Sequence, residues 1–502
     1  MKKTITIFAL LINFLATAQD GTLDNAFGTG GKVDFDFNSA IWQFIDMRMD
    51  YNNKIVVLGR NSSENPILVR LNLDGTLDTS FDGDGIKEIN FGVQYDTPAS
   101  FYIDDNDSNN LGYIVASSRK GAIAKINNDG SFASFGTNGF FYYNANNYAT
   151  GQRKVFVNID YDNGTIVVAS DEDQFLEQRI GVYKILASGA LDSGFNGNNP
   201  LLFYMSQGDE IVLNGINTDD SGGSFYVSGY KPTGTGNVTY IKKFSNTGVL
   251  DNSYNLFLGE YYLNSFGAPG IIFNGSDDAF ASYTFGMDYN SQMIITKRTS
   301  TGLADTSFGS NSAATVDFTN FYAESVKDVT GHEFESSFKI ILAGRSKEQS
   351  FSSSNISLAR INSNGSLDTS FGTAGKVTIP TQLYDLHVSL SAEVDYDNGK
   401  IYVMGNSASN TVSLYRFNLS SILSNPKFNT PEIAIFPNPT NAMINFSQEI
   451  NNLEVFDIMG KKIKSFEKTS ATFDVTDLEK GIYLLKGKAN NTVIFNEKLI
   501  RN

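Results

Sequence analysis

The side chains that most often carry catalysis or bind metals are scarce in this chain. Its 502 residues include no cysteine and two histidines, His332 and His387. Thiolate catalysis, disulfides and cysteine-ligated metals are therefore excluded. His332-Glu333 is followed by Phe-Glu-Ser, so the metal-binding pattern His-Glu-x-x-His is absent, and neither histidine neighbours a serine in a nucleophile-elbow motif. We expect neither a serine–histidine catalytic set nor a histidine-based metal site.

Carboxylates remain the candidates for chemistry, because the chain has 54 aspartates and glutamates. Two carboxylates can hydrolyse a glycoside together, but spacing singles out no pair among so many. The most suggestive segment is FDGDGIKE, in which Asp82 and Asp84 alternate with glycine. Alternating acids can place oxygens around Ca²⁺, although this segment lacks the EF-hand spacing and its closing glutamate. We favour a hydrated turn at these residues, keep a Ca²⁺ site at Asp82 and Asp84 as the alternative, and expect no other cofactor.

One acidic residue belongs to a signature that recurs along the chain. The signature is a small polar turn, then Leu-Asp, a short spacer and an aromatic residue followed by glycines, as in DGTLDTSFDGDG from Asp74 and NGSLDTSFGTAG from Asn364. Its aromatic residue occurs seven times, at intervals of 54 to 63 residues: Phe27, Phe81, Phe135, Phe195, Tyr254, Phe308 and Phe371. Such regular spacing indicates internal repeats.

The aspartate of the signature recurs with nearly every copy: Asp24, Asp78, Asp192, Asp251, Asp305 and Asp368. A residue that occurs once per repeat is unsuited to a single active site. We expect each aspartate to cap its local turn, with the leucine and the aromatic residue wedged between neighbouring units.

Strands must position these residues, and each repeat supplies four of them. One follows the glycines (GKVDFDF at Gly31), a less regular one comes next, and then an apolar run such as KIVVLG at Lys54. The apolar run predicts a strand buried on both faces. The last strand, such as ILVRLN at Ile67, carries one basic residue, which predicts a position nearer the solvent edge. The seven basic residues are Arg70, Lys125, Lys184, Lys243, Lys297, Arg360 and Arg416.

Four strands per unit, repeated seven times without intervening helices, predict an all-β fold: a seven-bladed β-propeller of four-stranded blades over residues 19–420. A β-helix has much shorter coils. Separate sandwich domains would each need a core within about 55 residues, which is marginal. The pattern leaves open whether the ring closes with seven complete blades or by pairing the N- and C-terminal strands.

The units resemble the delta-60 repeat of bacterial secreted proteins. DGSLDTSFG-type turns followed by GKV, with the KIxVxG and LARIN strands, carry the resemblance over residues 20–419. It implies a propeller-like architecture, and it brings no assigned activity and no catalytic residues.

Both ends of the chain carry export features. Residues 1–18 have Lys2 and Lys3, then an apolar run and Ala16-Thr17-Ala18, which predicts a signal peptide cleaved between Ala18 and Gln19. The apolar run is too short to span a bilayer, and we expect no transmembrane segment. Residues 421–430 form a polar linker, and residues 431–502 predict a small β-sandwich, because short strands alternate with turn residues.

This last domain resembles the type A C-terminal sorting domain of the type IX secretion pathway. The resemblance rests on FPNPTN at Phe436, VFDIMGKKI at Val455, DVTDLEKGIYLLK at Asp474 and the terminal KLIRN. It implies the type IX secretion machinery as a partner, a secreted or surface-attached product, and a Bacteroidota-like source.

Charge narrows the function further. A net charge of −16 argues against nucleic acid and anionic lipid as partners. We expect an extracellular binding or scaffold module for a protein or polysaccharide, with loops such as FFYYNANNYAT at Phe140 presenting the contacts. The alternative is a carboxylate-dependent hydrolase or lyase acting on polysaccharide, using carboxylates and Ca²⁺ at the central channel. We expect the single tryptophan, Trp42, to lie in the core.

Overall fold

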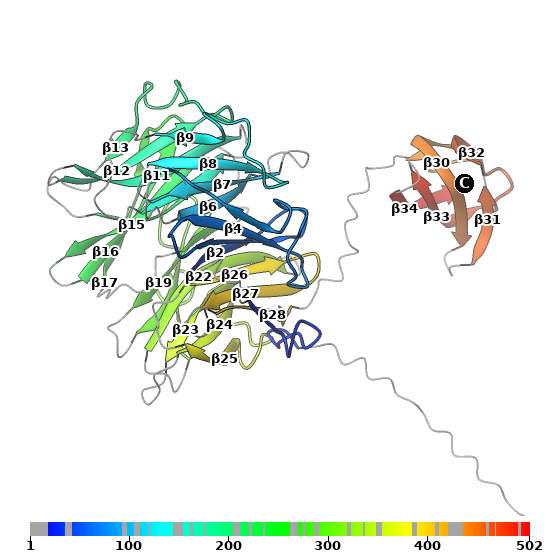
Figure 1. Cartoon of the computed structure of the whole chain (residues 1–502). Helices are drawn as coiled ribbons and strands as arrows, with labels where there is room; N and C mark the ends of the chain where they lie inside the picture. Colours follow the sequence, from blue (N-terminus) through cyan, green and yellow to red (C-terminus); the bar gives the residue numbers. More distant parts are fainter. Residues whose placement is uncertain are drawn as a thin grey trace, which may run out of the picture. The chain divides into compact units, whose positions relative to one another are not determined.

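The computed structural model forms two compact units, residues 1–422 and 423–502 (Figure 1). It describes residues 19–35, 43–92, 98–104, 111–118, 121–143, 154–160, 164–174, 177–203, 211–219, 223–233, 236–261, 270–274, 278–285, 291–318, 323–334, 337–347, 354–383, 389–406, 411–419, 435–457, 461–466, 468–489 and 493–501. The predicted leader, the linker, Trp42 and His387 lie outside these residues, as does the side chain of His332. No described helix is long and apolar enough to cross a membrane.

The first unit is the predicted β-propeller, in which the described strands form seven antiparallel four-stranded sheets. The blades are, from the inner strand outward: β2 (Gln43–Met49), β3 (Ile55–Arg60), β4 (Pro66–Leu71), β5 (Ile86–Glu88); β6 (Pro98–Asp104), β7 (Gly112–Ser117), β8 (Ala122–Asn127), β9 (Phe140–Tyr142); β10 (Val155–Asp160), β11 (Thr165–Gln174), β12 (Glu177–Ile185), β13 (Leu201–Phe203); β14 (Val212–Thr218), β15 (Ser224–Thr233), β16 (Gly236–Ser245), β17 (Leu250–Tyr261); β18 (Ile271–Phe273), β19 (Ala279–Phe285), β20 (Gln292–Arg298), β21 (Ala313–Val316); β22 (Ala323–Phe334), β23 (Ser337–Lys347), β24 (Ser354–Asn362), β25 (Lys376–Leu383); and β26 (Leu390–Asp395), β27 (Lys400–Asn406), β28 (Val412–Asn418), β1 (Lys32–Phe35).

The N-terminal strand closes the ring. Strand β1 pairs with β28 from Lys32 opposite Tyr415 to Phe35 opposite Val412, so it supplies the outermost strand of the seventh blade. The inner strand β2 of the first blade contacts the inner strand β26 of the last. Ring closure therefore occurs by pairing the two ends of the propeller segment. The strand after each signature's glycines is consequently the last strand of one blade, and the next inner strand begins the following blade.

The prediction for the basic strands was wrong. Strands such as β4 and β24 are third in their sheets and are covered by a fourth strand. Arg70, Lys184 and Arg360 are buried. The alternating pattern was interpreted as a solvent edge, but the basic side chain instead enters a polar network between blades.

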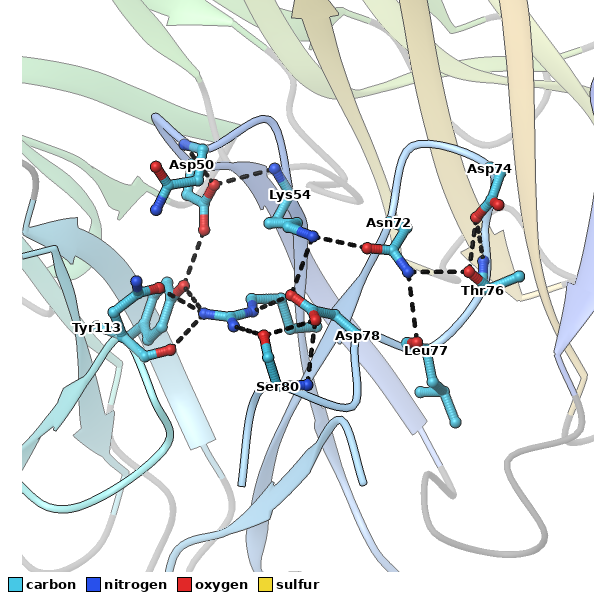
Figure 2. Close-up of polar contacts among 12 residues, drawn as sticks. Asp50, Lys54, Asn72, Asp74, Thr76, Leu77, Asp78, Ser80 and Tyr113 are labelled. Carbon is cyan, nitrogen blue, oxygen red and sulfur yellow. Dashed lines mark hydrogen bonds and ion pairs between the residues drawn. The ribbon is translucent and has the colours of Figure 1, made fainter. Parts of the chain in front are cut away.

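Figure 2 shows this network between the first two blades. The Arg70 guanidinium lies 2.9 Å from Asp78 through Nε and donates to the Tyr113 hydroxyl of the second blade at 3.0 Å. Lys54 pairs with the same carboxylate at 3.2 Å, and Tyr113 donates to Asp50 at 2.8 Å. Burial alone would raise the pKa of Asp78, but Ser80, Lys54 and Arg70 together lower it to about 2. The carboxylate is thus held ionised in the seam.

The signature residues divide into two groups. All six signature aspartates accept a hydrogen bond from the backbone N–H two residues on, as predicted for turn caps. All seven aromatic residues are buried between blades, also as predicted. The prediction for the leucine was wrong: Leu77 and Leu191 are 39% and 40% exposed and form single bridges to the adjacent strand. Backbone pairing, rather than wedging, explains the leucine position.

The polar turn bonds to the preceding blade. Its first residue accepts, through its backbone carbonyl, a hydrogen bond from the N–H just after the preceding aromatic residue. The described pairs, donor first, are Asp82–Asp129, Gly136–Ser188, Asn196–Thr247, Gly309–Asn364 and Gly372–Asp20, at 2.7 to 3.1 Å. The following glycine has positive φ and packs on the same neighbour.

Gly365→Ala is expected to destabilise the propeller more than Gly83→Ala. Both glycines have φ of +87°, where a Cβ costs about 1–2 kcal/mol by itself. At Gly365 a Cβ would lie 2.5 Å from the Gly309 nitrogen of the neighbouring blade, whereas at Gly83 it would meet no described atom within 4 Å. We expect about 1–3 kcal/mol of additional loss for Gly365→Ala, measured as the free energy of unfolding in urea. Equal losses would contradict the close packing of this turn.

The second unit is a small β-sandwich, as predicted. Its strands are β29 (Ile435–Phe436), β30 (Met443–Asp457), β31 (Lys462–Phe466), β32 (Ser470–Asp474), β33 (Gly481–Ala489) and β34 (Val493–Arg501). The long strand β30 pairs with β29, β31, β32 and β33, and so links the two layers. Its own apolar core includes Ile444, Leu453 and Phe473, all without exposed surface.

Candidate functional site in the propeller channel

A cavity of about 740 Å³ lies where the seven inner strands converge. Its lining comes from β2, β6, β10, β14, β18, β22 and β26, together with Ser228 of β15. Four of these strands carry a β-bulge at the same level, at Ile45, Ala99, Asn214 and Lys327. A bulge bends a strand and redirects the neighbouring side chains. The bulges thus turn the next residue of each strand toward the channel.

One ring position differs from blade to blade, although its place in the strand is constant. In β2, β6, β14, β22 and β26 it pairs with the residue just before a glycine or serine of the second strand. Its occupants are Asp46, Ser100, Gly215, Asp328 and Ser391. Because blades six, seven and one are consecutive, Asp328, Ser391 and Asp46 lie side by side.

A hydroxyl joins the two carboxylates of this row. Ser391 Oγ is 3.0 Å from Asp46 Oδ1 and 3.0 Å from Asp328 Oδ2, and the Ala392 N–H donates to the same Asp328 oxygen at 2.9 Å. A hydroxyl has one proton to donate. One carboxyl group must therefore be protonated to donate to Ser391. Burial, and secondly the charge of Asp46, raise the pKa of Asp328 to about 6, which identifies Asp328 as that group.

Arg48 and Glu393 extend the row. Arg48 Nε lies 3.5 Å from Asp46 Oδ2, and its guanidinium lies over the ring of Tyr102 at 5.4 Å. The side chain of Arg48 is 40% exposed, because it faces the channel although it lies deep in the ring. Burial raises the pKa of Glu393 to about 8; Arg48 opposes this shift and the two aspartates reinforce it. This group of Asp46, Arg48, Asp328, Ser391 and Glu393 is called the acid wall below.

Glu393→Gln is expected to raise stability at alkaline pH. The folded-state pKa of Glu393, about 8, exceeds its ordinary value of 4.5, so between these pH values the folded chain holds a proton that the unfolded chain releases. Stability from this group is therefore full below pH 4.5 and is lost as pH rises through 8. The variant lacks this loss. Its Tm should match that of the parent at pH 4.5 or below and exceed it at pH 9, while the exposed Glu88→Gln control follows the parent. Parallel Tm curves for parent and Glu393→Gln would contradict the assignment.

The remaining blades line the channel with neutral polar groups. Asn158 Nδ2 donates to the Ile216 carbonyl at 3.2 Å, and Thr218 Oγ1 donates to the Ile159 carbonyl at 2.9 Å. Ser100, Asn214 and Ser228 also line the cavity. The cavity is therefore charged on the side of blades six, seven and one, and uncharged on the side of blades two to four.

The residues predicted from the sequence lie elsewhere. Asp82 pairs with Lys87 at 3.0 Å, and Asp84 accepts from the Ile86 N–H at 2.9 Å, both in an exposed turn. Among the described residues no group of three or more His, Cys, Asp or Glu is arranged to hold a metal ion. The Ca²⁺ site at Asp82 and Asp84 stays a prediction.

The predicted cleavage site is described only on one side. Ala18 lies outside the described residues, whereas Gln19 Nε2 donates to the Gly372 carbonyl at 2.6 Å. Cleavage between Ala18 and Gln19 stays a prediction, and it would leave the ring-closing segment at the very start of the mature chain.

Sequence reasoning missed the acid wall. Its residues lie in IWQFIDMRMD, VKDVTGHEF and LSAEVDYD, which are inner strands. The available signal was an acidic residue within an apolar strand at a position where other copies have none. That signal has meaning only once the inner strand of each blade is known.

Comparison with known families concerns two parts of the chain. Residues 434–502 match the secretion system C-terminal sorting domain, and residues 52–81 and 339–371 match a β-propeller domain of unknown function, DUF5122. The chain is a β-propeller protein secreted by the type IX route. It is therefore released from the cell or attached to its outer surface, and its sorting domain engages the type IX machinery.

Solved structures resemble this propeller protein at low sequence identity. One is the extracellular domain of a protein described as a hybrid two-component system, BT4673 from B. thetaiotaomicron (13% identity, TM-score 0.41). That match covers 92% of this chain, which spans 56% of the other. Polysaccharide lyase Uly1 (11%, TM-score 0.44) matches over 75% of this chain and 90% of its own. Kuenenia stuttgartiensis hydrazine synthase (9%, TM-score 0.46) matches over 78% and 98%. No curated protein matches the sequence.

Proposed function

We propose that the propeller is an extracellular binding module whose ligand enters the central channel and contacts the acid wall. The observation that carries this proposal is the Asp46–Ser391–Asp328 row. Residues that serve only blade packing recur in every copy, as the signature aromatic residues do. This row does not recur, and placing two carboxylates around one hydroxyl deep in the ring opposes folding.

The acid wall offers varied polar contacts. Asp46 supplies an acceptor, Arg48 supplies donors, and protonated Asp328 or Glu393 can donate or accept. Phe101 and Tyr102 place aromatic surface beside Arg48. A concave site of this kind, with a few polar groups beside aromatic side chains, is typical of sites for small ligands or chain ends.

A second candidate function is hydrolysis or lysis of polysaccharide at the same wall. It is favoured by the separated pKa values of the carboxyl groups, about 6 for Asp328 and about 8 for Glu393. Near neutral pH one group can then serve as an acid while another serves as a base.

The test uses the purified mature protein in glycan-array and protein-binding screens, with parallel turnover assays on soluble polysaccharides. Asp328→Asn, Ser391→Ala and Arg48→Met are compared with the surface variant Glu88→Gln. We expect a ligand whose affinity falls at least tenfold in each channel variant and is unchanged in Glu88→Gln, without turnover. Turnover abolished by Asp328→Asn with binding retained would select the second candidate. Binding insensitive to all three channel variants would overturn the proposal.

A further inference from the structure

The side of the channel across from the acid wall carries polar groups without partners. The acid wall is centred on the seventh blade, so in a seven-membered ring the third and fourth blades lie farthest from it. On the fourth blade, Asn214 is 4% exposed and Ser228 is 1% exposed. Neither Asn214 Nδ2 nor Ser228 Oγ has a hydrogen-bond partner among the described residues, and both residues line the cavity. Ser100 Oγ of the second blade is in the same situation.

The local structure holds these groups available. Lys154 Nζ lies 3.4 Å from Asn214 Oδ1, which assigns the oxygen to the lysine and leaves the NH₂ group free. Asn214 is the bulged residue between Leu213 and Gly215. A Cβ at Gly215 would lie 3.2 Å from Ser228 Oγ, so the glycine leaves this hydroxyl uncovered. Gly215 has a side-chain-free place at the ring position where the first and sixth blades have aspartates.

Unpaired buried polar groups oppose folding, and native proteins keep few of them. Three on one side of one cavity therefore point to an occupant that supplies the missing hydrogen bonds. An amide NH₂ can only donate, whereas each hydroxyl can donate and accept. The complementary ligand carries several groups that do both, which is the chemistry of sugar hydroxyls.

We infer that the channel binds the end of a neutral, polyhydroxylated glycan, which spans from Asn214 and Ser228 to the acid wall. This inference rests on the proposed function and specifies its ligand class. An anionic glycan would bring its charge to three carboxylates, and a cationic one would gain nothing from the uncharged side. The volume, about 740 Å³, lies within the range of about 300–1,000 Å³ typical of small-ligand sites.

Isothermal titration of the mature protein tests the inference. The probes are the neutral tetraoses of cellulose, laminarin, mannan and xylan, with tetragalacturonate and the glucosamine tetramer as charged counterparts. Ser228→Ala places on the fourth blade the residue that the second and sixth blades have at this position (Ala116 and Ala343). We expect Ser228→Ala and Asn214→Ala each to weaken binding of a neutral tetraose at least tenfold, and Tm to stay level or rise, because an unpaired polar group has been removed.

Ser357→Ala is the matched control. Its hydroxyl is equally buried but is bonded to Ser346 Oγ at 2.6 Å, so this variant should lose Tm and keep binding. Binding of charged tetramers alone, or of no probe at millimolar concentration, would overturn the inference. So would neutral binding unchanged in Ser228→Ala and Asn214→Ala, or a loss of Tm in both as large as in Ser357→Ala. In each of these outcomes the proposed function still stands if Asp328→Asn weakens another bound ligand, and it fails if no channel variant affects binding.

Discussion

Deleting Gln19–Phe35 from the mature chain is expected to abolish the folded propeller. The deletion removes β1, which pairs with β28, and it removes Phe27 from an apolar cluster shared by the first and last blades. It also leaves Arg360, which has no exposed surface, without Asp20. Loss of one buried phenylalanine costs about 3–5 kcal/mol, and breaking one buried ion pair costs a similar amount. Together these losses rival the whole stability of a typical domain, about 5–15 kcal/mol.

Circular dichroism and thermal unfolding of the secreted chain measure this effect. The control is deletion of residues 434–502, which removes most of the second compact unit and should leave the Tm of the propeller unchanged. Expression of the control in a form that bypasses type IX export keeps the comparison fair. A cooperative transition within a few degrees of the parent after deletion of Gln19–Phe35 would show that β1 does not close the ring.

Arg360→Met is expected to be the most destabilising single substitution. Arg360 Nη1 lies 2.6 Å from Asp20 Oδ2 and Nε lies 2.9 Å from Asp368 Oδ2, and the guanidinium stacks on Phe371 at 5.0 Å. Methionine fills the space but leaves Asp20, which is 4% exposed, without its ion pair to Arg360. We expect a loss of about 3–5 kcal/mol in the free energy of unfolding, measured in urea at pH 7.

The pH dependence of this loss follows from Asp368. Burial raises the pKa of Asp368, but Ser370, Lys339 and Arg360 outweigh it and lower the value to about 2. A depressed pKa stabilises the fold above the ordinary value of 3.8, and this contribution disappears as pH falls toward 2. The difference between parent and Arg360→Met should therefore shrink below about pH 4.

Arg416→Met is the matched control at the neighbouring seam. Arg416 makes the equivalent bond to Asp24 at 2.9 Å, but its side chain is 17% exposed, and Lys400 pairs with the same carboxylate at 2.8 Å. The carboxylate thus keeps a partner, and we expect a clearly smaller loss. Equal losses for Arg360→Met and Arg416→Met would contradict the role assigned to burial.

Prediction from the sequence succeeded where one residue type repeats with a local role. Phe81 and Phe371 stand at the same point of their repeats, and both are buried. Asp78 and Asp368 each bond to the N–H two residues on, a contact that sequence spacing alone defines. Arg70 was misplaced because its partners Tyr113 and Asn128 come from the next blade, 43 and 58 residues away.

The sequence by itself determined the export domains, the seven units, their four strands and the turns that join them. These features depend on hydrogen bonds and packing between neighbours in the chain, so the residue pattern is enough to specify them. Only the tertiary structure decided how the ring closes and where a ligand can bind. Asp46 and Ser391 are 345 residues apart, and they meet because strand β1 joins the last blade and brings the first and last inner strands together. A contact set by ring closure leaves no trace in local spacing, and for that reason the acid wall and the unpaired groups across the channel emerged only from the fold.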